Sequence, residues 1–156
     1  MPSQLETESL ANVVRLAPLV SIDLIVRRQD DRVLLGRRTH PPARGWWFVP
    51  GGRIRKDERL ADAIRRLLAE ELGWTSEAAT RLRGAYEHFY PDNFRGTREF
   101  DTHYVVLAYE VLVDLGGHDL PLAQHSEYRW LSVAELLGSA DVHRYTQDYF
   151  RIDPSG

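Results

Sequence analysis

Short apolar runs and alternating patterns along the chain predict several β-strands. The run LVSIDLIV (19–26) is rich in β-branched residues, and RVLLG (32–36) follows it after a polar turn, so the two predict a β-hairpin. Asp23 is the one charged residue inside the first run. A short aromatic strand is predicted at 46–49, where Pro50 and two glycines end it. Further strands are predicted at 81–90, 102–113 and 128–131.

A helical period is clearest in the residues that follow these glycines. Asp57 is the expected N-cap and Gly73 the expected C-terminal stop, and apolar residues recur between them at three- and four-residue spacing (Leu60, Ala63, Ile64, Leu67, Leu68). A short helix is also predicted over 4–15, where Ser3 and Glu6 have capping-box spacing. Ser132 and Glu135 repeat that spacing, and a last helical turn is expected between 143 and 151.

This order of elements predicts an α/β fold. Strands around one long helix, with another helix near the end, are typical of an α/β/α sandwich with a mixed central sheet. The 156 residues suffice for one buried core and contain no repeat or linker, so a single domain over 1–156 is expected. A loop at Gly51 and Gly52 leads into the long helix and lies at the centre of this fold.

Composition narrows the classes of partner. The net charge of −3, from 23 acidic and 20 basic residues, leaves no basic surface suited to many nucleic-acid phosphates, so no nucleic-acid partner is expected. The absence of cysteine excludes a disulfide framework and a thiolate metal site. The polar, acidic start has no signal-peptide pattern, and no apolar run is long enough to span a bilayer. We therefore expect a cytoplasmic protein without a membrane partner.

Two adjacent carboxylates, Glu70 and Glu71, lie at the end of the long predicted helix. Oxygen ligands near a glycine loop suit Mg²⁺, which binds one or two carboxylates beside substrate phosphates. Successive helical residues point about 100° apart, so one of the two is expected to be a direct ligand. The alternative is a solvated acidic turn in which Arg66 and Glu70 form an i, i+4 ion pair.

The full spacing of residues 52–74 is more specific than the acidic pair. Five residues separate Gly52 from Glu58 and seven separate Glu58 from Arg66, and these are followed by Leu68, Glu70-Glu71, Gly73 and the apolar Trp74. This pattern resembles the Nudix box. The family has glutamate directly after the arginine, where this chain has Leu67. The resemblance therefore implies fewer metal ions than usual and a catalytic base from outside the box.

Segments beyond the box resemble one branch of that family, the GDP-mannose mannosyl hydrolases. They are PLVSIDLIV, LLGRRTHPPARGWWFVPGGR, EHFYPDNFRGT, THYVVL and QHSEYRWL, and the likeness runs from about residue 12 to about residue 150. The resemblance implies Mg²⁺-dependent hydrolysis of GDP-mannose, with GDP-glucose as a second substrate. In that branch water attacks the anomeric carbon with inversion and releases intact GDP. It also implies a homodimer.

The same resemblance implies the metal site and the base. Mg²⁺, with Mn²⁺ as the alternative, would be held by the main-chain carbonyl of Gly51, by Glu71 and by Gln124, and Glu70 is a further candidate ligand. His125 would be the general base, and a histidine is mostly neutral yet basic at cell pH. A solvated loop histidine is the alternative interpretation.

Other candidate residues would bind the substrate. The resemblance assigns Arg38, Arg53 and Arg66 to the diphosphate, and guanidinium groups suit the charge that develops on departing GDP. Tyr104 would donate to the diphosphate, whereas Asp23 and His88 would face the sugar. The alternative for the three arginines is a surface cation, and for Arg66 also an ion pair with Glu58 or Glu70. Tyr104 could instead be a packing aromatic residue, and Asp23 a paired structural aspartate.

Two other functions stay open from the sequence. A standard Nudix pyrophosphatase would use Glu70 and Glu71 together and attack phosphorus, with a base such as Glu99 in the long loop 91–101, and would yield GMP and sugar 1-phosphate. A non-catalytic nucleotide-sugar sensor would keep the fold without turnover. Product analysis separates the first from glycosyl hydrolysis, and ligand binding without turnover would indicate the second.

Overall fold

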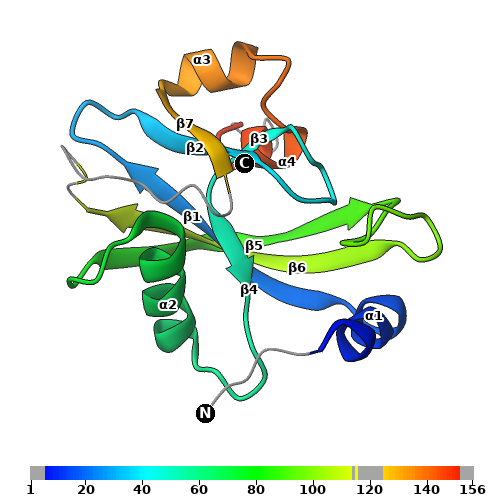
Figure 1. The fold of residues 1–156 in the computed structure, drawn as a ribbon. Coiled ribbons are helices and arrows are strands. Elements are labelled where there is room, and N and C mark those ends of the chain that lie inside the picture. The colour runs from blue at the N-terminus through cyan, green and yellow to red at the C-terminus, as the bar shows by residue number, and fades with distance from the viewer. Residues whose placement is uncertain (1–5, 114, 116–124, 152–156) are drawn as a thin grey trace.

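The computed structural model describes residues 6–113, 115 and 125–151, and for 125 and 126 it describes the backbone alone. A mixed seven-stranded sheet lies between helices (Figure 1). The order along the chain is α1 (Thr7–Leu16), β1 (Leu19–Arg27), β2 (Val33–Arg38), β3 (Trp47–Phe48), β4 (Gly51–Arg53), α2 (Leu60–Leu72), β5 (Ala79–Tyr90), β6 (Thr102–Leu112), β7 (His125–Leu131), α3 (Val133–Gly138) and α4 (Arg144–Asp148).

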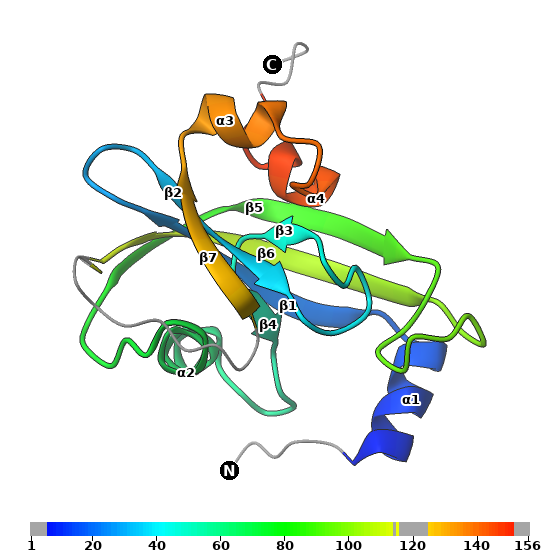
Figure 2. The same cartoon turned by 45° about the horizontal axis from the view of Figure 1, so that its top comes forward.

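The sheet is mixed because one strand pair is parallel. Strands follow the order β3-β2-β1-β6-β5, with β4 paired to β1 and β7 paired to β2. β1 and β6 run parallel, from Leu19 opposite Tyr104 to Arg27 opposite Leu112, and the other pairs are antiparallel. Helix α2 covers one face, and α3 and α4 cover the other (Figures 1 and 2). The predicted α/β sandwich with a mixed sheet is confirmed.

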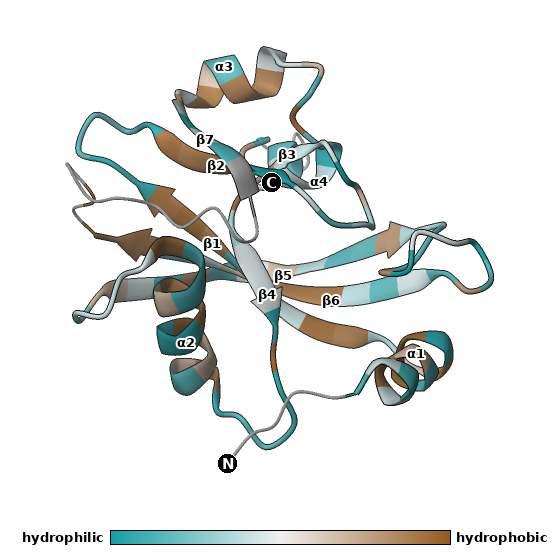
Figure 3. Cartoon of the chain, in the orientation of Figure 1, coloured by the Kyte–Doolittle hydropathy of each residue, from teal (hydrophilic) through white to brown (hydrophobic). Residues whose placement is uncertain are grey.

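Each face of the sheet has its own apolar core. Ile22, Leu24 and Val26 of β1 pack with the buried face of α2, whereas Ile25 packs with residues of α3 and the α4 region, as the two-residue alternation of a strand requires. A smaller cluster joins α1 to the start of β1 and to the 91–101 loop. In Figure 3 the middle strands β1 and β2 are mainly hydrophobic, and α2 carries polar residues on its outer side.

Two helix starts differ from the sequence prediction. The α1 helix begins at Thr7, and its N-cap Glu6 makes no side-chain capping bond; the Ser3 predicted to cap it lies outside the described residues. The predicted Asp57 cap of α2 is wrong, because Arg59 is the N-cap and Asp57 has a left-handed φ of 65°. Hydrogen bonds between Arg55 and Glu58 close a turn there, and that turn keeps Asp57 out of the helix.

The segment at Gly51 and Gly52, predicted to be a loop, is instead the start of strand β4. It pairs with β1 so that Gly51 lies opposite Asp23 and Gly52 opposite Ile22. A Cβ atom added at Gly51 would lie 2.3 Å from the Ile22 carbonyl oxygen, so glycine permits this close approach of the two strands. Strand propensity cannot reveal such a pairing.

Other local predictions are confirmed. The β1–β2 hairpin is present, and Gly73 ends α2 in a left-handed conformation in which its N–H donates to the Ala69 carbonyl, the bond of an αL C-cap. Ser132 and Glu135 form the predicted capping box at α3. β7 is longer than predicted and begins at His125. None of the helices in the described part of the chain has the length and hydropathy needed to cross a membrane.

Candidate active site

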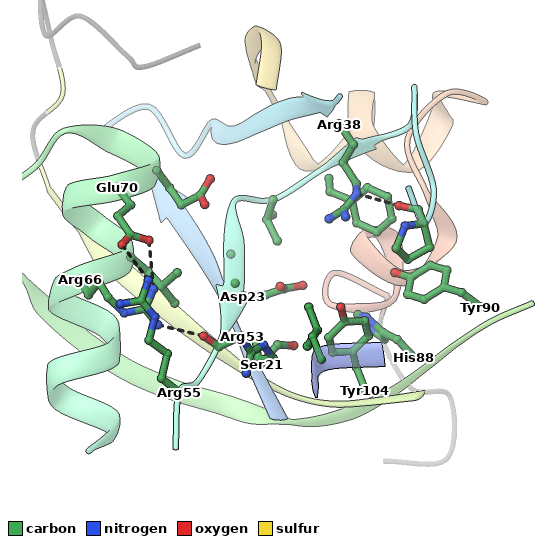
Figure 4. Close-up of a pocket in the computed structure, with 18 residues that line it drawn as sticks. Ser21, Asp23, Arg38, Arg53, Arg55, Arg66, Glu70, His88, Tyr90 and Tyr104 are labelled. Atoms are coloured by element: carbon green, nitrogen blue, oxygen red, sulfur yellow. Dashed lines mark hydrogen bonds and ion pairs between the residues drawn. The ribbon is translucent and has the colours of Figure 1, made fainter. Parts of the chain in front are cut away.

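A cavity of about 330 Å³ opens where β1, β4 and the end of α2 meet (Figure 4). Residues from six strands and two helices line it, including nine that the sequence analysis selected: Asp23, Arg38, Gly51, Arg53, Arg66, Glu70, Glu71, His88 and Tyr104. The acidic end of α2 lies on one side of the view and His88 with Tyr90 on the other. The fold thus gathers predicted residues that are up to 81 positions apart in the chain, from Asp23 to Tyr104.

The two remaining predicted residues fall at the limit of the described chain. Gln124 lies outside the described residues, so its predicted role as a ligand stays a prediction. The backbone of His125 begins β7 and lies opposite Arg38 of β2, after an irregularity in the register. Because Arg38 lines the cavity, this pairing brings the backbone of His125 to the same end of β2.

Glu71 is the buried carboxylate on the α2 side of the cavity. It is 5% exposed, and burial, followed by the nearby charge of Glu70, raises the pKa of its carboxyl group to about 7. The Tyr128 hydroxyl donates to the Glu71 main-chain carbonyl at 3.1 Å and holds this end of the helix against β7. A carboxylate in this environment gains from a nearby cation, which would favour its ionised form.

Glu70 is more exposed and already paired. Its carboxylate lies 3.0 Å from Arg66 and 3.6 Å from Arg55. As the sequence analysis anticipated for successive helical residues, Glu70 and Glu71 differ in environment. Glu71 is therefore the better candidate for direct contact with a metal.

Gly51 offers a main-chain oxygen to the same site. Leu24 N–H donates to the Pro50 carbonyl at 2.8 Å, and Ile54 N–H donates to the Val20 carbonyl at 2.9 Å. The alternation of an antiparallel ladder then makes the intervening Asp23–Gly51 pair a non-hydrogen-bonded one, so the Gly51 carbonyl points away from β1. Among the described residues, no three His, Cys, Asp or Glu side chains form a metal-binding group. Main-chain and substrate oxygens would have to complete the shell of a hard cation, which is how Mg²⁺ often binds.

Arg66 is committed to a network within the protein. It binds Glu58 through two nitrogens at 2.7 and 2.9 Å, and a third contact reaches the Arg53 carbonyl at 2.9 Å. The Glu58 side chain is 4% exposed, and the guanidinium lowers the pKa of its carboxyl group. The ion pair that the sequence left open is therefore present, and Arg66 holds the start of α2 to β4.

Leu67 occupies the position where the Nudix box has glutamate. Its side chain is in the core on the α2 face and is 2% exposed. A Cβ atom added at Gly52 would lie 2.5 Å from the Leu67 Cδ2, so the leucine packs directly over the glycine. An apolar side chain thus fills the space between α2 and β4.

Two further cations and a tyrosine line the middle of the cavity. Arg38 Nε donates to the Pro42 carbonyl at 3.0 Å, and its guanidinium lies over the Phe48 ring. Burial lowers the pKa of Arg53 and raises that of Tyr104, and the two groups interact. Neither shift changes the charge state at neutral pH, so Arg53 is a cation and Tyr104 a neutral donor.

The side of the cavity toward α4 carries a buried polar network. Asp23 accepts a hydrogen bond from the Tyr149 hydroxyl, and His88 Nε2 lies 3.4 Å from the same hydroxyl. The His88 ring stacks on Tyr145 with 4.2 Å between centroids. Burial raises the pKa of the Asp23 carboxyl group to about 6 and lowers the pKa of His88 to about 4. At neutral pH this gives an anionic aspartate beside a neutral histidine.

Sequence reasoning missed Tyr90, Arg55 and Tyr149. Tyr90 lines the cavity two residues after His88 on β5, so the two-residue period of a strand was a usable signal. Arg55 lines it from the turn before α2. Tyr149 is 126 residues from Asp23 along the chain, and no local pattern links the two.

The arrangement is suited to a negatively charged, phosphate-containing substrate. One end offers carboxylate and carbonyl oxygens for a divalent cation, and the middle offers the guanidinium groups of Arg38 and Arg53. Asp23, in the middle, and His88, on the far side, can bind hydroxyl groups or stabilise positive charge.

Comparison with known proteins agrees with this geometry. A family model described as NUDIX domain matches residues 17–151. The low-salt glycan biosynthesis protein Agl8 of Haloferax volcanii is 42% identical over 118 residues, which cover 75% of this chain and 72% of that protein. The ADP-ribose pyrophosphatase of Methanocaldococcus jannaschii is 27% identical over 139 residues, or 87% of this chain and 75% of the relative.

Solved structures show the same fold. The MutT protein from Methanosarcina mazei Go1 superposes with a TM-score of 0.68 at 25% identity, covering 85% of this chain and 91% of that one. The Nudix domain of Shewanella oneidensis NrtR in complex with ADP ribose gives a TM-score of 0.63 at 24% identity over 94% of this chain and 96% of that one. Because the family model matches residues 17–151 and the box at 52–74 lies beside the cavity, this chain belongs to the Nudix hydrolase family.

Proposed function

We propose that this protein hydrolyses GDP-mannose to GDP and free mannose, and accepts GDP-glucose as a second substrate. Water attacks the anomeric carbon with inversion, so the C–O bond of the sugar breaks and GDP leaves intact. The observation that carries this proposal is the buried Leu67, packed over Gly52 where the family box has a glutamate.

Leu67 changes what the helix side of the cavity can do. A leucine side chain neither binds a metal nor accepts a proton, and its 2% exposure leaves no water-filled space at that position. Activation of water must therefore come from another element. The Asp23 carboxylate lies between the acidic end of α2 and the His88 imidazole on the opposite side, and these two groups suit the hydroxyl groups and the developing positive charge of a sugar ring.

Each remaining residue has a role in the proposal. The Gly51 carbonyl, Glu71 and Gln124 would hold Mg²⁺, with Mn²⁺ as the alternative, and the ion would supply positive charge against the negative charge of the departing GDP. Arg38 and Arg53 contact the diphosphate, and Tyr104 donates a hydrogen bond to it. His125 takes the proton of the attacking water.

Arg66 keeps the role that the resemblance implies and adds a structural one. Its ion pairs fix the turn 55–58 and present Arg53 and Arg55 to the cavity, and its charge acts on the diphosphate from there. The name of the Haloferax relative, a glycan biosynthesis protein, agrees with a sugar nucleotide as the substrate.

The decisive experiment is turnover of GDP-mannose in ¹⁸O-labelled water, with the masses of both products measured. We expect label in mannose and none in GDP. Label in GMP, GDP or mannose 1-phosphate would overturn the proposal. In parallel, His125→Gln should lower kcat by about 10²-fold, as expected for loss of a general base. A kcat near that of the wild type would remove His125 from the mechanism.

A pyrophosphatase that attacks phosphorus is the second candidate. The lining of the same cavity by both Glu70 and Glu71 favours it, because two carboxylates can hold more than one metal ion. It predicts GMP and sugar 1-phosphate as products, which chromatography separates from GDP and mannose. Tight binding of GDP-mannose without either product would indicate a sensor.

A further inference from the structure

Helix α4 contributes a side chain that reaches the cavity wall without lining the cavity. Tyr149, at the C-cap of α4, is 1% exposed, and its hydroxyl lies between Asp23 and His88. The ring packs among the apolar residues of the α3–α4 face and makes an edge contact with Tyr86 at 4.7 Å. The packing of the ring therefore fixes the place of the hydroxyl.

The hydroxyl can donate its one proton to one partner. Asp23 Oδ2 is the acceptor, and an ionised carboxylate only accepts hydrogen bonds. The contact with neutral His88 is then made in the other direction, with its Nε2–H donating to the Tyr149 oxygen over 3.4 Å. The three groups form a directed chain from His88 through Tyr149 to Asp23.

This chain determines which Asp23 oxygen is available. With Oδ2 held by Tyr149, the other oxygen, Oδ1, lies next to Gly51, within 2.5 Å of a Cβ atom added there. Gly51 lines the cavity on the side of the acidic helix end. Oδ1 is therefore turned toward the middle of the cavity, between the acidic helix end and His88.

We propose that Tyr149 is a positioning residue that orients the Asp23 carboxylate, and through it tunes catalysis at the sugar, although it does not touch the substrate. This inference rests on the proposed function, in which Asp23 faces the sugar. Without the hydroxyl, the carboxylate is free to rotate and to lose the orientation that the transition state requires.

The test removes the hydroxyl and keeps the ring. Tyr149→Phe should lower kcat by at least about tenfold, the effect of losing one hydrogen bond to a charged group, while KM changes less than threefold. Tyr109→Phe is the matched control, because Tyr109 packs against the core on the α2 face and does not line the cavity. It should keep its kcat.

A double-mutant cycle separates positioning from a general packing defect. If Tyr149 acts through Asp23, adding Tyr149→Phe to Asp23→Asn should lower kcat less than twofold further. Multiplicative losses, or a kcat of Tyr149→Phe equal to that of the wild type, would overturn the inference. The kinetics of these variants can be measured whichever products form. In the ¹⁸O experiment, label on a phosphate oxygen refutes the proposed function. If the enzyme does release mannose, multiplicative losses of kcat in the double mutant refute only the role of Tyr149.

Discussion

Replacing Asp23 with asparagine should stabilise the protein, and the gain should depend on pH. Asp23 is buried, and burial outweighs the Tyr149 hydrogen bond and the attraction of Arg38, so the pKa of its carboxyl group rises from 3.8 to about 6. A group whose pKa is higher in the folded state favours folding most when protonated. The protonated carboxyl group therefore makes its full contribution to the free energy of unfolding below pH 3.8, and this contribution is lost as the pH rises through about 6.

The magnitude follows from the pKa difference. A rise from 3.8 to about 6 corresponds to roughly 3 kcal/mol of unfolding free energy at neutral pH, as an order of magnitude. The asparagine of Asp23→Asn would not carry this penalty and can still accept the Tyr149 hydrogen bond. The variant should therefore match the wild type near pH 4 and exceed its stability by about 1–3 kcal/mol at pH 8, a rise of several degrees in Tm.

Urea denaturation at pH 4.5, 6 and 8, followed by tryptophan fluorescence and with EDTA present, measures this difference. EDTA is needed because a bound cation would stabilise the folded wild type by mass action. Asp101→Asn, at an exposed position, is the control for the loss of a carboxylate without burial. A constant difference between the Asp23→Asn variant and the wild type at all three values, or a loss at pH 8, would refute the reasoning about burial.

Three other predictions concern the helix side of the site. Glu71→Gln should weaken Mn²⁺ binding at least about tenfold, measured by electron paramagnetic resonance of the free ion; equal binding would mean that another carboxylate is the ligand. Arg66→Ala should cost roughly 3–5 kcal/mol in urea denaturation because it leaves the buried Glu58 carboxylate without its partner, and a loss below about 1 kcal/mol would contradict the ion-pair network. Gly52→Ala should cost roughly 1–3 kcal/mol by collision with Leu67, and less in a Leu67→Ala background; strict additivity would show that the two do not compete for space.

The sequence revealed the parts of the fold that depend on local pattern. The apolar period of α2, its stop at Gly73 and the alternation of β5 and β6 each follow from short-range preferences, and each is present. The start of α2 was mispredicted because an acidic residue before an apolar run resembles a cap. Bonds between Arg55 and Glu58 form a turn at that place instead.

Residues of the site were found where they break a pattern. Asp23 stands out as a charge within an apolar strand, and the acidic pair stands out at the end of a helix, so the sequence pointed to both sides of the cavity. Strand β4 and Tyr149 were not predictable, because each depends on a contact with β1 that forms only when the sheet and α4 pack together.

The network around Arg66 has a consequence for ligand-induced dynamics. One guanidinium connects the turn at 55–58, the end of β4 and Glu70, beside the Arg55–Glu70 ion pair and the turn's own Arg55–Glu58 bonds. A diphosphate that drew Arg66 toward itself would remove its bonds to Glu58 and to the Arg53 carbonyl. Amide hydrogens of that turn would then exchange faster with solvent in the complex. A substrate held by Arg38 and Arg53 alone would leave the exchange rates of these amide hydrogens unchanged.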